Sequence, residues 1–121
     1  MNSESNSERH KVNLDLYKFE NLTDFTKAVL LATKKIPPGK ITTYKFLAQA
    51  IKRPKAIRAV ASALKKNPNL IKIPCHRVIR SDGRIGGYRL GSKKKSWLLR
   101  KEGIVLTKDR VNYFEELIYK F

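Results

Sequence analysis

The chain is poor in cysteine, with Cys75 the single one among 121 residues. One thiol cannot form an internal disulfide, and it cannot build a zinc site from several cysteines. No metal site is therefore expected. Residues 1–11 are polar and lack the apolar segment of a signal peptide. We expect a reducing, intracellular compartment, in which a free thiol stays reactive.

Long hydrophobic runs are also missing. No apolar stretch approaches the roughly 20 residues that a membrane-spanning helix needs, so no membrane partner is expected. The length suits one domain with one modest core. We expect residues 1–20 to form a tail, disordered at first and then extended over 12–19, and residues 21–121 to form that domain, as a monomer.

Acidic residues are scarce: 10 Asp and Glu stand against 27 Lys and Arg, which gives a formal net charge of +17. A domain this basic is suited to a polyanion, and nucleic acid is the first candidate. An anionic membrane surface is a weaker one. The lysine-rich surface of a heat-adapted protein is compatible with nucleic-acid binding.

The first half of the chain has helical patterns. Thr23 can cap a helix over 24–35, in which Phe25, Val29 and Ala32 share one face.

A pair of short helices follows. Thr42 or Thr43 can cap a helix over 44–51, and Arg53-Pro54 separates it from a second helix over 55–66. Two short helices joined by a tight turn fit a helix-turn-helix, although an ordinary helical hairpin is more common.

A small wing is predicted next. Val78-Ile79 and Ile85 flank the turn signal Ser81-Asp82-Gly83, a pattern that predicts a β-hairpin. The expected fold is mainly α, a winged helix-turn-helix-like DNA-binding domain with a small β-hairpin wing.

The last third predicts two more helices. Ser92 can cap a helix over 93–102 with Trp97 and Leu98 on its core face. Helical spacing also suggests a final helix from Asp109, although its aromatic residues tolerate a strand.

Chemistry is concentrated in Pro74-Cys75-His76-Arg77-Val78. A free thiol has a pKa of about 8.5, and the thiolate is the nucleophile. A base that acts directly or through one water can activate it. Taken alone, a Cys-His pair is more often a small buried hydrophobe beside an imidazole.

Read through to Glu102, the sequence resembles the O6-alkylguanine-DNA alkyltransferases. The resemblance spans about Phe25 to Leu106 and is to their C-terminal catalytic domain, whereas the usual members carry a further N-terminal domain. We expect the aromatic C-terminal tail to cover core that this domain shields elsewhere. The matching residues are Thr43-Tyr44, Arg58-Ala59-Val60, Asn67-Pro68, Ile73 to Ile79, Gly86-Gly87-Tyr88, Trp97-Leu98-Leu99 and Glu102-Gly103.

The resemblance implies a catalytic set. Cys75 accepts the alkyl group irreversibly, and His76 deprotonates it through water. Glu102 holds the histidine in the useful tautomer, although alone it reads as a surface carboxylate. Asn67 ties the recognition helix to the active-site turn. Each molecule acts once, and no cofactor is needed.

The resemblance also implies duplex DNA containing O6-alkylguanine as the partner. Tyr44 donates to guanine N3 and favours base flipping, and Arg58 takes the place of the extruded base. Ile57 adds an apolar contact. The remaining expected contacts are the small residues that approach the minor groove and the lysines that meet phosphates, namely Ala59, Ala61 and Ser62, then Lys65, Lys66 and Lys93 to Lys95.

The guanine pocket is the last implied feature. Tyr88 forms a wall, and backbone groups near Cys75, Val78 and Arg89 read the guanine edge. Many family members have a small residue where this chain has Arg89, so the pocket rim is expected to be more basic or narrower.

Two alternatives stay open. One is a lesion-binding protein of the same fold that transfers nothing, against which the intact Cys75-His76 pair argues. The other is a sequence-specific winged-helix regulator, although the alanine-rich second helix offers few base-reading side chains.

Overall fold

The structure, a computed structural model, describes residues 19–121. The predicted tail over 1–20 and the extended stretch over 12–19 lie almost wholly outside these residues. The fold is mainly α with short strands, as predicted. Its elements in chain order are α2 Asp24–Thr33, β1 Thr42–Thr43, α3 Tyr44–Ala50, α4 Ile57–Leu64, the 3-10 turn η1 Cys75–Arg77, β2 Val78–Ile79, α5 Ser92–Lys101, β3 Leu106–Thr107, β4 Arg110–Val111 and α6 Phe114–Leu117.

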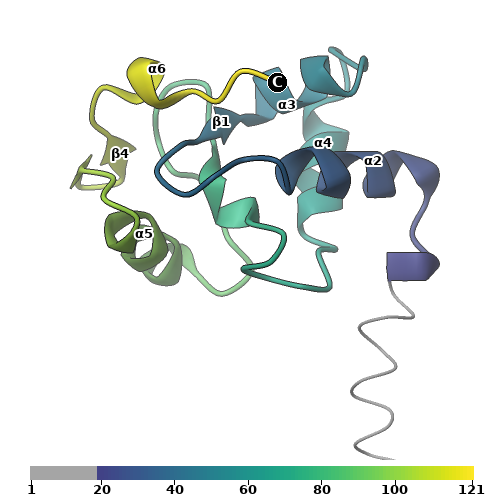
Figure 1. Cartoon of the computed structure of the whole chain (residues 1–121), viewed down its shortest axis with the longest axis horizontal. Coiled ribbons are helices and arrows are strands. Elements are labelled where there is room, and N and C mark those ends of the chain that lie inside the picture. The colour runs from purple at the N-terminus through teal and green to yellow at the C-terminus, as the bar shows by residue number, and fades with distance from the viewer. Residues whose placement is uncertain (1–18) are drawn as a thin grey trace, which may run out of the picture.

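Two groups of elements lie side by side, with β1 between them (Figure 1). The helices α2, α3 and α4 pack together around a core that includes Val29, Leu47 and Val60. A second core is formed by residues from β2, α5 and the C-terminal strands, including Ile79 and Leu99. The site lies where these two cores meet.

Helix α2 forms as predicted. The side chain of Thr23 accepts a hydrogen bond from the backbone N–H of Thr26 at 3.1 Å, which satisfies one free donor of the first turn. Val29 is fully buried. The helix ends at Thr33, before the proline pair Pro37-Pro38.

The helices α3 and α4 form the predicted helix-turn-helix. Thr43, rather than Thr42, caps α3, and its side chain accepts from the N–H of Phe46 at 3.0 Å. Helix α4 is shorter than predicted at both ends, and no side chain caps it at Ala56. Its start is delayed because the residues after Pro54 form a turn in which Ala56 N–H donates to the carbonyl of Arg53.

The predicted hairpin over Val78 to Ile85 was wrong in its pairing. Val78 and Ile79 form β2, which pairs in parallel with β1. The turn after it exists, since Arg80 N–H donates to Arg84 O at 2.8 Å, but Arg84 then bridges to Arg110. The antiparallel hairpin of the fold is β3–β4.

Helix α5 corrects two predictions. It begins at Ser92 itself, with Gly91 as the capping residue at φ 97°, so Ser92 does not cap it. Trp97 is 50% exposed, because the buried face of the helix consists of Lys95 and Leu99. The ammonium groups of Lys94 and Lys101 lie 4.3 and 4.7 Å from the centre of the Trp97 ring.

The C-terminal segment is mostly extended, contrary to the predicted helix from Asp109. Only α6 is helical, and Ile118 then lies parallel to Ile41. Ile41 N–H donates to Leu117 O at 3.0 Å, and Tyr119 N–H donates to Ile41 O at 2.7 Å. None of the helices within residues 19–121 has the length and apolar character needed to span a membrane.

Candidate active site and nucleic-acid interface

The turn η1 places Cys75 and His76 side by side at the junction of the two cores. Cys75 N–H donates to Ile73 O at 2.8 Å, and Arg77 N–H donates to Pro74 O at 2.9 Å. The Cys75 and His76 side chains are 7% and 1% exposed. Both reactive groups are therefore held by a short, rigid turn between Pro74 and β2.

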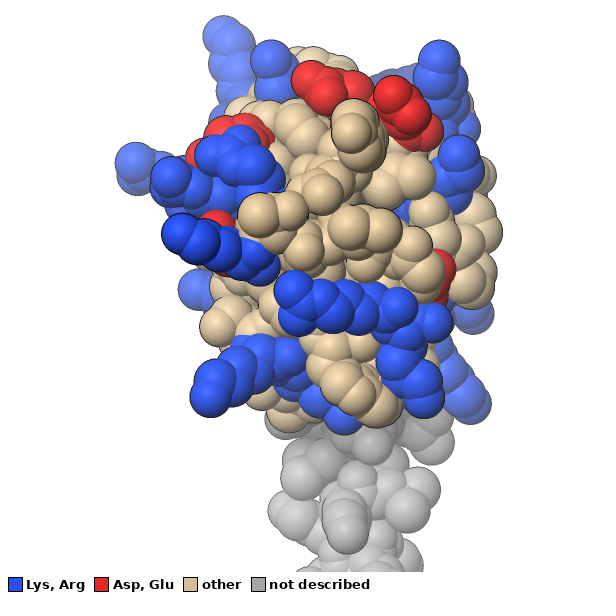
Figure 2. Space-filling view, turned by 90° about the vertical axis from the view of Figure 1, so that its left-hand side faces the viewer, with Lys and Arg blue, Asp and Glu red and all other residues tan. Residues whose placement is uncertain are grey.

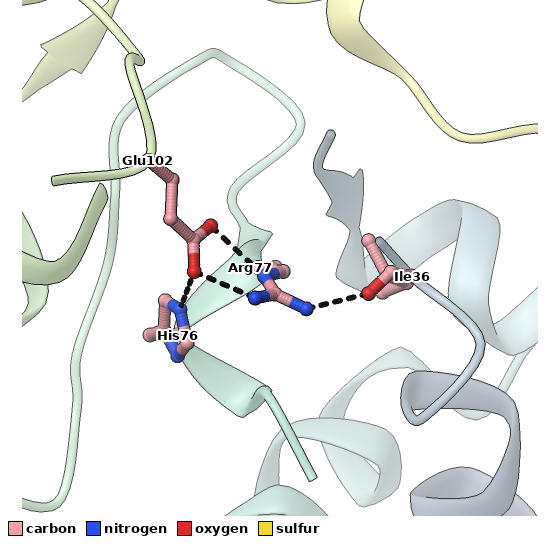
Figure 3. Close-up of polar contacts among 4 residues, drawn as sticks. All are labelled: Ile36, His76, Arg77 and Glu102. Atoms are coloured by element: carbon pink, nitrogen blue, oxygen red, sulfur yellow. Dashed lines mark hydrogen bonds and ion pairs between the residues drawn. The ribbon is translucent and has the colours of Figure 1, made fainter. Parts of the chain in front are cut away.

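His76 and Arg77 share one carboxylate (Figure 3). His76 Nε2 lies 2.9 Å from Glu102 Oε2, while Arg77 donates through Nε at 2.9 Å and Nη2 at 2.6 Å to the two oxygens of Glu102. Arg77 also donates through Nη1 to Ile36 O at 2.6 Å. The pairing of His76 with Glu102 was predicted through the resemblance, whereas the part played by Arg77 was not.

The electrostatics of this group favour a neutral histidine. Burial lowers the pKa of His76, and the bond to Glu102 offsets this only in part. Burial by itself would raise the pKa of Glu102, but hydrogen bonds from Arg77 and His76 lower it below its ordinary value. A neutral imidazole that donates from Nε2 to Glu102 carries its lone pair on Nδ1. That Nδ1 is buried and has no hydrogen-bond partner within residues 19–121, so it is free to accept a proton.

Cys75 is protonated in the resting protein. Burial raises the pKa of its thiol, while the side chain of Asn67 and the cations Lys95 and Arg89 act in the opposite direction. The thiol therefore needs a base, and the adjacent imidazole is one.

Lys95 is buried. It was predicted to contact DNA phosphates, together with Lys93 and Lys94, and for Lys95 this prediction was wrong. Its Nζ donates to Val78 O at 2.7 Å and to Gly87 O at 3.0 Å. Burial lowers its pKa to about 7. It connects β2 to the Gly86-Gly87 bend. Its spacing from Leu99, one helical turn away, is the signal that could have placed it on the inner face.

Asn67, which follows α4, is fully buried. Its Nδ2 donates to Ile73 O at 2.7 Å, and its Oδ1 accepts from Asn69 N–H at 2.8 Å. Its carbonyl accepts from Arg89 Nη1 at 2.8 Å. One residue thus connects the end of α4 with the segment that enters η1 and with the loop after Tyr88.

A cavity of about 570 Å³ opens beside the thiol. It is large enough for a small organic group such as a purine. Several predicted site residues come together in it. It is lined by Tyr44, Ala61, Leu64, Lys65, Cys75, Arg80, Gly86, Gly87, Tyr88 and Arg89.

The two tyrosines give the cavity aromatic walls. The ring of Tyr88 is edge-on to His76, with centres 6.4 Å apart, and its buried hydroxyl has no partner within residues 19–121. Burial raises the pKa of Tyr88 to about 12 and also raises that of Tyr44. A Cβ at Gly86 would lie 3.3 Å from the Tyr44 hydroxyl, and Gly86 has φ 74°, so this bend needs glycine.

The other predicted DNA contacts lie outside the cavity. Ile57, Arg58, Ala59 and Ser62 are exposed on α4. The side chain of Val78 is buried in the core, so only its backbone could meet a ligand.

Charge is distributed unevenly along the chain. No Asp or Glu occurs between Asp24 and Asp82, a stretch that includes α3, α4 and η1. Figure 2 shows the face that carries α5, the β3–β4 hairpin and α6, where Lys and Arg surround an uncharged area and the few acidic groups lie toward the margins. Within residues 19–121, no group of three or more His, Cys, Asp and Glu side chains is placed to hold a metal ion.

Comparison with known proteins supplies a family for this arrangement. The family model described as the 6-O-methylguanine DNA methyltransferase DNA-binding domain matches residues 24–104. The bifunctional transcriptional activator and DNA repair enzyme Ada of Escherichia coli is 51% identical over 80 residues, 66% of this chain and 23% of that protein. A methylated-DNA–protein-cysteine methyltransferase of Methanosarcina barkeri is 50% identical over 80 residues, 66% of this chain and 51% of that protein.

Comparison with solved structures agrees with this family match. The Mycobacterium tuberculosis protein OGT in complex with DNA superposes with a TM-score of 0.66 at 41% identity, covering 68% of this chain and 51% of that one. Schizosaccharomyces pombe Atl1, bound to damaged DNA containing O6-carboxymethylguanine, gives 0.71 at 28% identity over 84% of this chain and 99% of that one. The chain spans about half the length of the methyltransferase relatives it matches, and about a quarter of Ada.

Proposed function

Because the chain belongs to the family of 6-O-methylguanine DNA methyltransferase DNA-binding domains, we propose that it transfers an alkyl group from O6 of guanine in duplex DNA to Cys75. The observation that carries the proposal is the Nδ1 of a neutral His76, which is buried and has no hydrogen-bond partner among residues 19–121. This imidazole is next in the chain to the thiol and is held by Glu102. Since buried polar atoms seldom lack a partner, this nitrogen is placed to bond a water or a substrate group.

The transfer is a displacement at the alkyl carbon. His76 Nδ1 takes the thiol proton through one water, and the sulfur attacks the carbon bonded to O6. The S–C bond forms as the C–O bond breaks, and the electron pair stays on the purine, which takes up one proton to become guanine. Cys75 ends as a thioether, so each molecule acts once.

The charges around η1 favour the ionised intermediate. Glu102 stabilises the imidazolium that forms, and Arg77 keeps Glu102 ionised. Lys95 and Arg89 favour the thiolate. Lys95 also fixes the carbonyls of Val78 and Gly87, so the backbone around the base-binding cavity is preorganised.

Helix α4 is the proposed DNA-reading helix. Its small residues Ala59, Ala61 and Ser62 would allow close approach to the minor groove, and Arg58 would replace the extruded base. Ala61 and Lys65 line the cavity, which supports entry of the flipped base from this side. Tyr44 would donate to the leaving purine. We propose that the protein acts as a monomer inside the cell.

A second candidate is lesion binding without transfer. The structural similarity to Atl1, which extends over 99% of that chain, favours it. The intact thiol and its paired base favour transfer.

Intact-mass measurement separates the two. Incubation with duplex containing O6-methylguanine should add about 14 Da to the Cys75 peptide, because a methyl group replaces the proton of the thiol nucleophile. O6-benzylguanine tests the size of group the cavity accepts. Cys75→Ser is the matched control and should bind the lesion without gaining mass. An unmodified wild-type peptide at full lesion excess, with lesion binding intact, would establish the second candidate instead.

A further inference from the structure

In the part of the chain that the structure describes, the cavity beside Cys75 is lined by three cations and by no carboxylate. Lys65, Arg80 and Arg89 contribute the positive charge. From this we infer that the site prefers O6-alkyl groups that end in a carboxylate over neutral groups of the same size. The inference rests on the proposed transfer to Cys75.

Arg89 is an exposed residue at the cavity whose guanidinium is anchored by one hydrogen bond. Its Nη1 donates to the carbonyl of Asn67 at 2.8 Å, and Asn67 is itself fully buried. This bond uses one of the five N–H donors of the guanidinium, so a fork of donors remains for a ligand. Arg89 is also close enough to Cys75 to favour its thiolate.

Arg80 and Lys65 add charge that is only weakly compensated. Arg80 pairs with Asp82 at 3.1 Å, but both side chains are largely exposed, so the pair neutralises little. Lys65 is exposed at the end of α4. The other lining groups are aromatic, aliphatic or glycine, apart from Cys75.

The reaction places an anionic substituent near these groups. The attacked carbon bonds to Sγ in the transition state, and a carboxylate on that carbon is one bond further away. It therefore lies within the cavity that Cys75 and Arg89 both line. Guanidinium and carboxylate can form two parallel hydrogen bonds, whereas a neutral alkyl group offers the donors nothing.

These cations could instead serve only the DNA phosphates. The bond from Arg89 to Asn67 argues against this for Arg89, because it holds the guanidinium at the cavity in the absence of DNA. The two roles differ in an observable way. A phosphate contact strengthens every lesion duplex equally, whereas a substituent contact strengthens only the anionic one.

A pair of isosteric lesions tests the inference. The same duplex is prepared with O6-carboxymethylguanine and with O6-carbamoylmethylguanine, which differ in charge and hardly in size. We expect the second-order rate constant for S-alkylation of Cys75 to be about tenfold larger for the carboxylate, as for one charge-assisted hydrogen bond. Arg89→Gln should lower this ratio clearly, leaving only the contribution of Lys65 and Arg80. Arg100→Gln, which removes the same charge from the exposed face of α5, should leave the ratio intact.

Failure of the inference and failure of the proposed function look different. If O6-methylguanine is repaired but the two isosteres react equally, or if Arg89→Gln lowers both rates alike, the inference is overturned. If no lesion transfers, the proposed function fails. The affinities of Cys75→Ser for the two isosteric duplexes then still decide the charge preference, since binding needs no thiol.

Discussion

The two neighbouring side chains of η1 face different surroundings, one a connected set of hydrogen bonds and the other a cavity. On the His76 side, Glu102, Arg77 and the carbonyl of Ile36 are joined in one connected set of hydrogen bonds. On the Cys75 side lies a cavity in which the Tyr88 hydroxyl has no partner within residues 19–121. The base is held rigidly, and the nucleophile faces open space.

This difference separates two requirements of the proposed chemistry. A base acts best when its tautomer and orientation are fixed in advance, which the carboxylate and guanidinium do. A nucleophile that must meet a bulky purine needs room. A three-residue turn satisfies both because successive side chains leave it in different directions.

The bonded side should be the more sensitive to substitution. Glu102→Gln leaves His76 without an anionic partner, so we expect the transfer rate to fall about 100-fold, a typical contribution of acid–base catalysis. Single-turnover kinetics measure it. Glu115→Gln, on exposed α6, is the control and should transfer normally.

The same carboxylate gives a pH test of stability. The pKa of Glu102 is lowered in the folded state, so its stabilising contribution is present above the ordinary pKa of glutamate. The contribution is lost as pH falls through the lower folded pKa. The stability gap between wild type and Glu102→Gln should therefore narrow in acid. If the difference in the free energy of unfolding between the two proteins did not change with pH, this would contradict the ion pairs of Glu102.

Asn67 is the strongest bonded group on the cavity side. Asn67→Ala removes the donor to Ile73 O, in a buried hydrogen bond, and the acceptor for Asn69 N–H, in a partly buried one. We expect the free energy of unfolding to fall by about 2 kcal/mol, as measured by urea denaturation. Asn69→Ala, at an exposed side chain, should change it little. If Asn67→Ala and Asn69→Ala lowered the free energy of unfolding equally, the side-chain hydrogen bonds of Asn67 would contribute less to stability than its contacts indicate.

Lys95 donates to the carbonyls of Val78 and Gly87, and the free energy of unfolding should depend on its protonation. It loses its proton near pH 7 when folded but only above 10 when unfolded, so the unfolded state binds more protons between these values. Stability should therefore rise with pH above 7, by about 1 kcal/mol per pH unit. Lys95→Met should abolish the rise. The pH dependence of stability with Lys95 and with Lys95→Met is best measured in proteins that also carry Cys75→Ser, because the thiol titrates in the same pH range.

The smallest effect is expected at Tyr88. Its hydroxyl is buried and unpaired, so Tyr88→Phe should leave the free energy of unfolding unchanged or raise it by up to about 1 kcal/mol. Tyr113→Phe, at a side chain that is 76% exposed, should have no effect. A clear loss of stability in Tyr88→Phe would mean that the hydroxyl is bonded, and the contrast between the two sides would weaken.

Sequence reasoning predicted the helical half of the fold better than the rest. Thr23, Pro54 and Asn67-Pro68 are local signals that mark where helices begin and end. The strands have only two residues each, too few for alternation to show, and the partner of β2 comes from a distant segment. The hairpin around Asp82 was therefore predicted with the wrong partner.

Site residues that belong to the sequence motif could be predicted, whereas residues whose role depends on burial could not. Cys75, His76 and Glu102 were found through the resemblance, and the structure brings the last two into contact. Lys95 was missed because only its carbonyl acceptors, at Val78 and Gly87, make a buried lysine tolerable. Trp97 was misplaced because lysine side chains cover its ring outside the core.

The parallel pairing of β1 with β2 has a consequence for engineering. The strand that leads into Tyr44 and the strand that leaves η1 are aligned by the pairs Thr42–Val78 and Thr43–Ile79. The two ends of the intervening helix pair are thereby pinned at neighbouring points. Because that segment carries Tyr44, Ala61 and Lys65 as well as η1, an insertion or deletion in the helix pair would shift the walls of the cavity rather than being absorbed in a loop.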